Sequence, residues 1–194
     1  MRHEPQAAAW GEGNYDTDST EGLTLRRWRP ADIDALVRHA NNRNVWINLK
    51  DRFPHPYTEA EARAWIAHCD ARTGETTTFA IDWQGEAVGG VGLEPMADVY
   101  RLTATVGYWL GEPFWGRGFA TQALRALSAY AFSTFDLHRL EAAVFGWNLA
   151  SARVLEKAGY SLEGRLRRSV IKDGRIADSL LYARLRELPT VVVR

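Results

Sequence analysis

The sequence predicts an α/β fold built as a single domain. Segments with the two-residue alternation of strands and segments with the 3.6-residue period of helices follow one another in the order β-α-α-β-β-β-α-β-α-β-β. Short turns with glycine, typical of hairpins, connect some of the strands. A chain of 194 residues, 46% of them apolar, is long and apolar enough to fold around one core. Together these observations indicate a central sheet covered by helices.

The N-terminal part of this domain is predicted to contain a strand and two helices. Residues 23–28 alternate between apolar and polar side chains, as a half-buried strand does. Pro30 starts a helix with acidic residues in its first turn, where the helix dipole favours negative charge. Thr58 and Glu61 have the spacing of a capping box, which predicts the start of the second helix.

A meander of three strands follows, at residues 79–83, 88–93 and 102–110. Residues 84–86 form the turn between the first two strands. The segment after the third strand has apolar residues at helical spacing, namely Ala120, Ala123, Leu124, Leu127, Ala131 and Phe135. A helix therefore follows the meander directly.

The C-terminal part is predicted to contain a strand, a helix and a hairpin. Residues 140–144 alternate as a strand. A helix over 149–158 lies between Asn148, a preferred N-cap, and Gly159, a preferred residue after a helix end. The Asp-Gly pair at residues 173–174 is a strong signal for a hairpin turn.

The turn between the third meander strand and its helix has the properties of an anion site. Gly116 and Gly118 lack a Cβ, so the backbone can turn sharply there and approach a ligand closely. The helix that follows exposes its first amide N–H groups, and its dipole adds positive potential. Arg117 adds a fixed positive charge. These residues indicate a site for a phosphate or diphosphate group.

Two common phosphate-binding loops fit this turn poorly. The P-loop requires a lysine where this chain has Arg117 and a hydroxyl residue where it has Gly118. The dinucleotide-binding fingerprint requires a third glycine where the chain has Thr121. From these residues alone, a glycine turn that binds nothing stays an alternative.

Residues 115–121 resemble the diphosphate loop of the GNAT N-acetyltransferase superfamily, whose pattern is [QR]-x-x-G-x-[GA]. Trp115 replaces the leading Gln or Arg, and the resulting form, W-G-[KR]-G-[FIY]-A-[ST], is common in the branch of ribosomal-protein N-terminal (alanine/serine) acetyltransferases. Residues 148–160 resemble a second motif of that branch, N-x-x-S-x-x-[VL]-[LY]-E-K-x-G-[FY]. Because the two motifs occur in the family's order, the chain is identified as a GNAT member.

The resemblance implies the GNAT fold, a mixed and mostly antiparallel central sheet with a splayed strand pair, flanked by about four helices. The strand ending near Leu110 and the strand over 139–147 would be the splayed pair. The resemblance covers a single acetyltransferase domain at residues 22–188. We expect residues 1–21 to form a flexible leader and residues 189–194 a C-terminal tail.

The resemblance also implies acetyl-CoA as the co-substrate. Splayed strands leave N–H and C=O groups unpaired, and the backbones of Trp109 and Leu110 would bond the pantetheine arm instead. The Leu110 N–H would stabilise the oxyanion that forms when an amine attacks the thioester. The other residues implied in binding acetyl-CoA are Gly116, Arg117, Gly118, Phe119, Ala120, Thr121, Asn148 and Ser151.

Proton transfer is harder to assign. Many superfamily members protonate the departing thiolate with a tyrosine at the place where this chain has Leu155. The resemblance gives that role to Ser151, which alternatively only bonds backbone at the start of its helix. Some relatives carry a glutamate as the base where this chain has Val170, and Glu94 and Asp178 are the substitutes.

The acceptor is expected between the segment 42–57 and the last hairpin, and its predicted contacts are Asn44, Trp46, Tyr108 and Asp178. At pH 7 an α-amino group with a pKa near 8 is about one-tenth neutral, whereas a lysine amine with a pKa near 10.4 is neutral about once in 2,500. A site without a strong base therefore favours the α-amino group of a protein or peptide. A small-molecule amine (a polyamine, an amino-acid analogue or an antibiotic) and a non-catalytic acetyl-CoA-binding module are the alternatives.

The composition limits the classes of binding partner and the cellular location that we expect for the protein. The 24 basic residues balance 24 acidic ones, so the chain lacks the charge excess typical of proteins that bind nucleic acid or anionic membranes. Its one cysteine, Cys69, permits no internal disulfide, and we expect no metal site. No apolar run reaches the roughly 20 residues of a membrane span. The polar, acidic N-terminus has no apolar h-region, so we do not expect it to act as a secretory signal. We expect a cytoplasmic monomer or homodimer.

Overall fold

The computed structural model describes residues 22–187, and the predictions of a leader at residues 1–21 and of a tail at residues 189–194 lie outside them. The helices are α1 (Ile33–Ala40), α2 (Arg43–Trp46), α3 (Glu59–Asp70), α4 (Phe119–Thr134) and α5 (Leu149–Lys157). The strands are β1 (Leu23–Arg26), β2 (Thr78–Trp83), β3 (Glu86–Pro95), β4 (Thr103–Leu110), β5 (Arg139–Phe145), β6 (Ser161–Lys172) and β7 (Arg175–Leu185). Short 3-10 turns lie at η2 (Pro30–Asp32), η3 (Asp98–Tyr100) and η4 (Glu112–Phe114).

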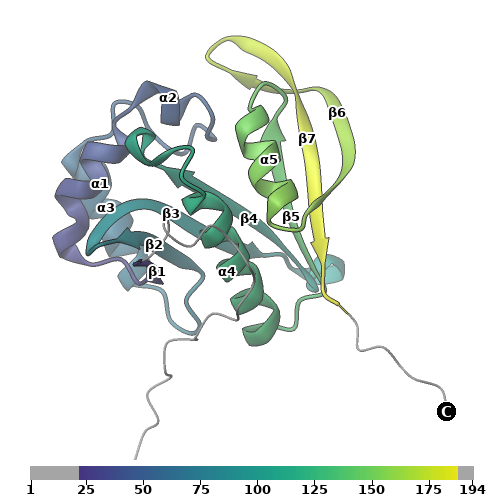
Figure 1. The fold of residues 1–194 in the computed structure, drawn as a ribbon, viewed down its shortest axis with the longest axis horizontal. Coiled ribbons are helices and arrows are strands. Elements are labelled where there is room, and N and C mark those ends of the chain that lie inside the picture. The colour runs from purple at the N-terminus through teal and green to yellow at the C-terminus, as the bar shows by residue number, and fades with distance from the viewer. Residues whose placement is uncertain (1–21, 188–194) are drawn as a thin grey trace, which may run out of the picture.

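The strands form one seven-stranded sheet in the order β1-β2-β3-β4-β5-β7-β6 (Figure 1). Every neighbouring pair is antiparallel except β4 and β5, which are parallel. The predicted α/β class, with a mixed and mostly antiparallel sheet, is therefore confirmed. The turn at residues 173–174 has positive φ at both positions, as a tight hairpin turn requires.

β4 and β5 pair only at their first residues. The register joins residues 103–105 of β4 to residues 139–141 of β5, and the pairing then stops. β4 continues to Leu110 along β3, while β5 continues to Phe145 along β7. The two strands therefore diverge toward their C-terminal ends (Figure 1). This divergence is the splayed pair that the family resemblance implied.

Helices cover both faces of the sheet (Figure 1). On the face of α4 and α5, the large buried side chains include Phe119, Leu124, Leu127, Leu140 and Leu155. On the face of α1 and α3, the buried cluster contains Trp28, Leu36, Ala40, Tyr57, Ala62 and Ile66. The apolar area removed from water in these two clusters attaches the helices to the sheet. Within residues 22–187, no helix is both long enough and apolar enough to cross a membrane.

The short helix α2 was not predicted. The sequence indicated a binding loop over 42–57, but residues 43–46 form one helical turn inside it. The Asn42 side-chain oxygen accepts hydrogen bonds from the N–H groups of Asn44 and Val45, which caps this turn. A helix of one turn is too short to show a 3.6-residue period, so the periodicity gave no signal.

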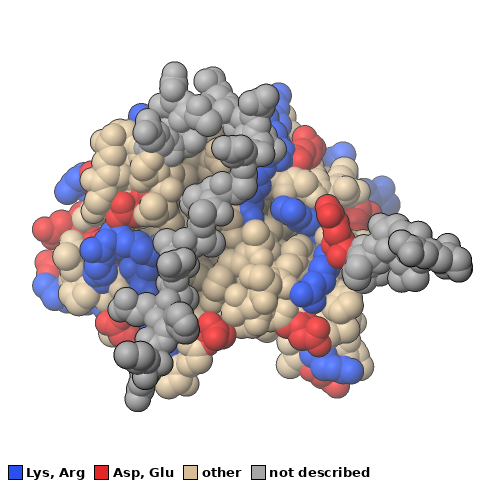
Figure 2. Space-filling model, turned by 60° about the horizontal axis from the view of Figure 1, so that its bottom comes forward, with Lys and Arg blue, Asp and Glu red and all other residues tan. Residues whose placement is uncertain are grey.

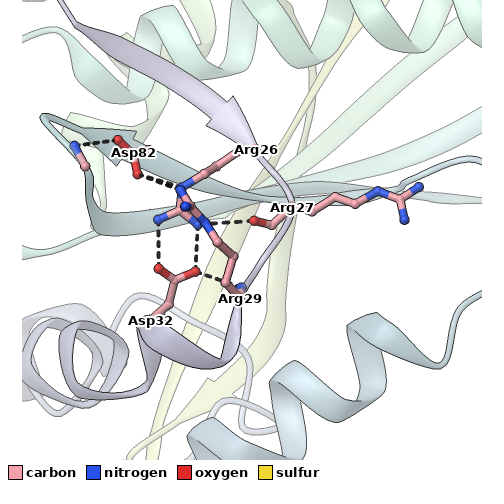
Figure 3. Close-up of polar contacts among 6 residues, drawn as sticks. Arg26, Arg27, Arg29, Asp32 and Asp82 are labelled. Atoms are coloured by element: carbon pink, nitrogen blue, oxygen red, sulfur yellow. Dashed lines mark hydrogen bonds and ion pairs between the residues drawn. The ribbon is translucent and has the colours of Figure 1, made fainter. Parts of the chain in front are cut away.

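Arg26 joins three parts of the N-terminal half (Figure 3). Its guanidinium donates two bonds of 2.7 Å to Asp32 and one bond of 2.6 Å to Asp82. Asp32 ends η2, Asp82 lies in β2, and both are buried. The hydrogen bond to Asp32 is the largest cause that raises the pKa of Arg26. These bonds fix β1 to the start of α1 and to β2.

Charges of both signs are intermixed on the surface. Figure 2 shows Lys and Arg side chains beside Asp and Glu side chains, around an area without charged residues. No single sign dominates the described part of this face, as the equal numbers of acidic and basic residues suggest.

Candidate active site

The peptide groups of β4 alternate between β3 and the gap beside β5. The Gly111 N–H donates to the Val88 carbonyl at 2.8 Å, so the odd-numbered residues of β4 pair with β3. The peptide groups of Tyr108 and Leu110 are consequently directed at the gap. Trp109 corrects an expectation: its peptide group belongs to the β3 ladder, so its backbone is not placed to bond a pantetheine arm.

Trp115 closes the end of β4. Its Nε1 donates to the Leu110 carbonyl at 2.7 Å, while its side chain stays 44% exposed. The sequence showed Trp115 only as a departure from the loop pattern. In the structure it ties the end of β4 to the glycine turn. The Leu110 N–H, which this bond does not involve, is directed at the gap.

The glycine turn has the backbone that its residues predicted. Gly116 has φ of 77° and Gly118 has φ of 81°, both in the left-handed region that favours glycine. Gly118 is the N-cap of α4, and within the described chain no side chain caps this helix. The first amides of α4, at residues 119–121, therefore open onto the turn. Their partial positive charge suits a phosphate group.

Arg117 is held against aromatic rings beside this turn. Its guanidinium carbon lies 4.5 Å from the ring centroid of Trp83 and 5.0 Å from that of Phe119. Such cation–π contacts favour one position of the charged group. The positive charge predicted for the turn is thus attached to the aromatic cluster where β2 ends and α4 begins.

Ser151 and Tyr108 form a pair between α5 and β4. The Ser151 Oγ lies 2.7 Å from the Tyr108 hydroxyl, and that hydroxyl also donates to the Ser151 carbonyl at 3.1 Å. Burial raises the pKa of Tyr108, so the phenol stays protonated at ordinary pH. Tyr108 was predicted to contact the acceptor together with Asn44 and Trp46. In the structure its hydroxyl is directed at α5.

Asn148, which precedes α5, and Leu155, within α5, have structural contacts. The Asn148 side-chain oxygen accepts the Ser151 N–H at 3.0 Å, so Asn148 caps the helix as its type predicts. Leu155, at the place of the common tyrosine acid, is fully buried in the core. It therefore packs as an apolar residue.

The segment 42–57 is attached to the end of β4 by Glu112, a residue that the sequence did not single out. The Glu112 carboxylate accepts bonds from the Asn42 amide at 2.7 Å and the Asn44 amide at 2.9 Å. The Trp109 ring lies 5.6 Å from the Phe53 ring of the same segment. Trp109, rather than Tyr108, is therefore the β4 side chain that meets this segment.

The two acids considered as bases are both engaged. Asp178 accepts bonds from the Arg168 N–H at 2.8 Å and from Arg165 Nε at 2.6 Å. The Arg168 bond is the largest cause that lowers the pKa of Asp178, which makes it a weak base. Glu94 pairs with Arg52 at 3.5 Å and lies opposite Thr105, where β4 and β5 are still paired.

The comparisons with known proteins agree with this geometry. Residues 22–161 match the family model described as "Acetyltransferase (GNAT) domain". The chain belongs to the GNAT acetyltransferase family. It is similar to the "Uncharacterized N-acetyltransferase p20" of Bacillus licheniformis, with 31% identity over 88% of this chain and 97% of that protein. The family and such relatives identify the protein as an N-acetyltransferase enzyme.

Solved GNAT structures share the fold. The "RimL- Ribosomal L7/L12 alpha-N-protein acetyltransferase in complex with Coenzyme A" is 25% identical, with a TM-score of 0.73 over 85% of this chain and 94% of that chain. The spermidine N-acetyltransferase of Vibrio cholerae "in complex with CoA and spermine" is 24% identical, with a TM-score of 0.70 over 84% of this chain and 95% of that chain. These two GNAT enzymes differ in acceptor, so the fold alone does not select one.

Proposed function

We propose that the protein transfers the acetyl group of acetyl-CoA directly to an amine, and that the preferred acceptor is the α-amino group of a protein or peptide. The observation that carries the proposal is the divergence of β4 and β5 beside the glycine turn, with the Leu110 N–H directed at the gap. The coenzyme A in the RimL structure supports the choice of donor.

Acetyl-CoA would bind along this gap. Its diphosphate would accept hydrogen bonds from the amides of residues 117–121, with Arg117 adding charge. Its pantetheine arm would pair with the N–H and C=O groups of Tyr108 in place of a neighbouring strand. The Leu110 carbonyl is already bonded to Trp115, so Leu110 would contribute its N–H to the thioester carbonyl. Ser151 would lie beside the arm, because its Oγ is bonded to the side chain of Tyr108, a residue of β4.

The reaction would be a direct acyl transfer. The amine nitrogen attacks the thioester carbon, and the Leu110 N–H stabilises the oxyanion that develops. The C–S bond then breaks, the thiolate takes the proton of the Ser151 hydroxyl, and the Ser151 oxygen takes a proton back from water. The Tyr108 hydroxyl has one hydrogen; when that hydrogen turns from the Ser151 carbonyl to the Ser151 Oγ, 2.7 Å away, the serine hydrogen is free to point at sulfur. The proton released by the acetylated nitrogen goes to water.

The preference for an α-amino acceptor follows from the two acids considered as bases, which are both engaged in ion pairs. The pKa of Asp178 is lowered, and Glu94 is paired with Arg52. An α-amino group is partly neutral at pH 7, whereas a lysine amine needs a base to be deprotonated. RimL, by its name an α-N-protein acetyltransferase, supports this choice.

Release of free thiol from acetyl-CoA tests the function. We expect release with a peptide whose N-terminus is free and none above background with the same peptide formylated at its N-terminus, even when it contains lysine. Equal release with both peptides would contradict the preference for α-amines. Binding of acetyl-CoA without release for any peptide or polyamine would favour a non-catalytic module.

Gly116→Ala is expected to raise the Kd of acetyl-CoA about tenfold, because a side chain at positive φ costs about 1–2 kcal/mol and shifts the turn to another conformation. A Cβ at Gly116 would meet nothing within 4 Å, so the effect comes from the backbone alone. Gly74→Ala is the matched control, since Gly74 has φ of 87° and equally open space, far along the chain from the turn. Calorimetry giving equal affinities for both variants would remove the turn from the binding site.

A further inference from the structure

Among the described residues, three polar contacts between side chains connect the β4 side and the β5 side of the splayed strands, beyond the ends of these strands. On the β4 side lies the segment 43–51, which is anchored through Glu112. On the other side lie Trp147, just after β5, and the tip of the β6–β7 hairpin. The contacts are Lys172 Nζ to Asp51 Oδ1 (2.7 Å), an Arg43 guanidinium nitrogen to Asp173 Oδ2 (2.6 Å) and Trp147 Nε1 to Asn48 Oδ1 (3.1 Å). We call these three contacts the bridge.

Lys172 is the buried member of the bridge. Its side chain is 1% exposed, whereas the neighbouring residues at the tip, Ile171, Asp173 and Gly174, are exposed. Lysine is rarely buried unless its charge is paired. The bond to Asp51 supplies that pairing, and the ammonium also lies 3.7 Å from the ring centroid of Trp46, a close cation–π contact. Contact with the segment 43–51 is thus what buries Lys172.

Trp46 is held in place to receive this ammonium. Its ring stacks on His55 with centroids 5.5 Å apart, and Arg43 lies 5.5 Å from its centroid. Arg43 is in turn bonded to Asp173 of the hairpin. The tip of the β6–β7 hairpin bends toward α2 in Figure 1, as these contacts require.

We propose that Lys172 is a specificity-determining residue of the acceptor site, a role that rests on the proposed function. The bridge spans the open end of the gap between β4 and β5. The thioester would lie in this gap. An amine must therefore reach the thioester beneath the bridge, which admits a slender chain end and hinders a branched amine. Asp51 and Asp173 are both already bonded to cations, so the bridge offers a polyamine no free carboxylate.

Lys172→Met tests this role, because methionine fills a similar volume without the charge. The acceptors are two peptides that differ only in the first residue, which is glycine (slender) in one and valine (branched) in the other. We expect the ratio of kcat/KM for the glycine peptide to kcat/KM for the valine peptide to fall about tenfold in the variant. The Kd of acetyl-CoA stays at the wild-type value. Amide hydrogen exchange in residues 43–51, measured without substrates, should become about tenfold faster, since the segment loses an attachment. Lys157→Met, which removes an exposed lysine of α5, is the matched control.

Asp51→Asn is a second test of the same contact, to be used if Lys172→Met does not fold. The Asp51 side chain is 76% exposed, so the substitution leaves the core intact while weakening the bond to Lys172. We expect the same direction of change with a smaller size. If both variants keep the wild-type acceptor ratio and the wild-type turnover, the role of Lys172 is overturned, while the proposed function stands. No acetylation of any acceptor by the wild type overturns the proposed function, and the exchange rates still decide whether the bridge holds the segment.

Discussion

Ser151→Ala is expected to lower kcat about 100-fold and to leave the Kd of acetyl-CoA nearly unchanged. A positioned general acid contributes about 10²–10⁴ to a rate, and the lower end applies here because a thiolate leaves more readily than an amine or alkoxide. The Ser151 backbone keeps its bond to Asn148 in the variant, so α5 stays capped. Steady-state rates from thiol release, together with calorimetry, separate the two effects.

Tyr108→Phe tests whether the pair acts together. The ring is retained and the hydroxyl is lost, so Ser151 would no longer be oriented by the 2.7 Å bond. We expect kcat to fall about tenfold, less than for Ser151→Ala, because the acid itself remains. If the two residues act through one proton path, the double variant should be no slower than Ser151→Ala alone.

Ser161→Ala is the control, since Ser161 is an exposed serine at the start of β6. Its kcat should match that of the wild type. Full turnover in Ser151→Ala would exclude Ser151 as the acid and leave water as the proton donor. A drop in kcat that is matched by an equal loss of acetyl-CoA affinity would instead show that Ser151 holds the cofactor.

Local signals predicted the elements that carry the site. The third meander strand was predicted over 102–110 and is found as β4 at Thr103–Leu110. The helix predicted over 149–158 is found at Leu149–Lys157. Both predictions succeeded because alternation and capping depend on neighbours in sequence. The glycine turn succeeded for the same reason, since positive φ is a property of single residues.

Contacts between distant segments were not predictable in this way. Alternation places Tyr108 and Trp109 on opposite faces of β4, but it does not say which face meets α5. Only the packed sheet brings Tyr108 to Ser151, 43 residues later. The same holds for Asn42 with Glu112 and for Lys172 with Asp51, which are 70 and 121 residues apart. No local pattern encodes such pairs.

Arg26→Ala is expected to lower the free energy of unfolding by about 3 kcal/mol and the Tm by about 10 °C. The substitution leaves the buried carboxylate of Asp32 without its cation. The buried carboxylate of Asp82 keeps only the more distant Arg29, at 3.8 Å, whose side chain is exposed. Each keeps one backbone bond, from the N–H groups of Arg29 and Gly85 respectively, which cannot balance a buried charge. Removal of one partner from a buried ion pair is far more costly than the pair's net contribution.

Arg26→Lys separates charge from geometry. A lysine supplies one ammonium, which cannot reproduce the two parallel bonds to Asp32 together with the bond to Asp82. We expect a loss of about half that of Arg26→Ala, measured by denaturant unfolding.

Arg63→Ala is the matched control, because the pair of Arg63 with Glu59 joins two side chains that are 65% and 61% exposed. Its expected cost is below about 0.5 kcal/mol, as for other exposed pairs one helical turn apart. Equal costs for Arg26→Ala and Arg63→Ala would mean that water reaches Asp32 and Asp82 once the guanidinium is gone. The attachment of β1 to η2 and β2 would then rest on the strand ladder and the apolar core instead of on these charges.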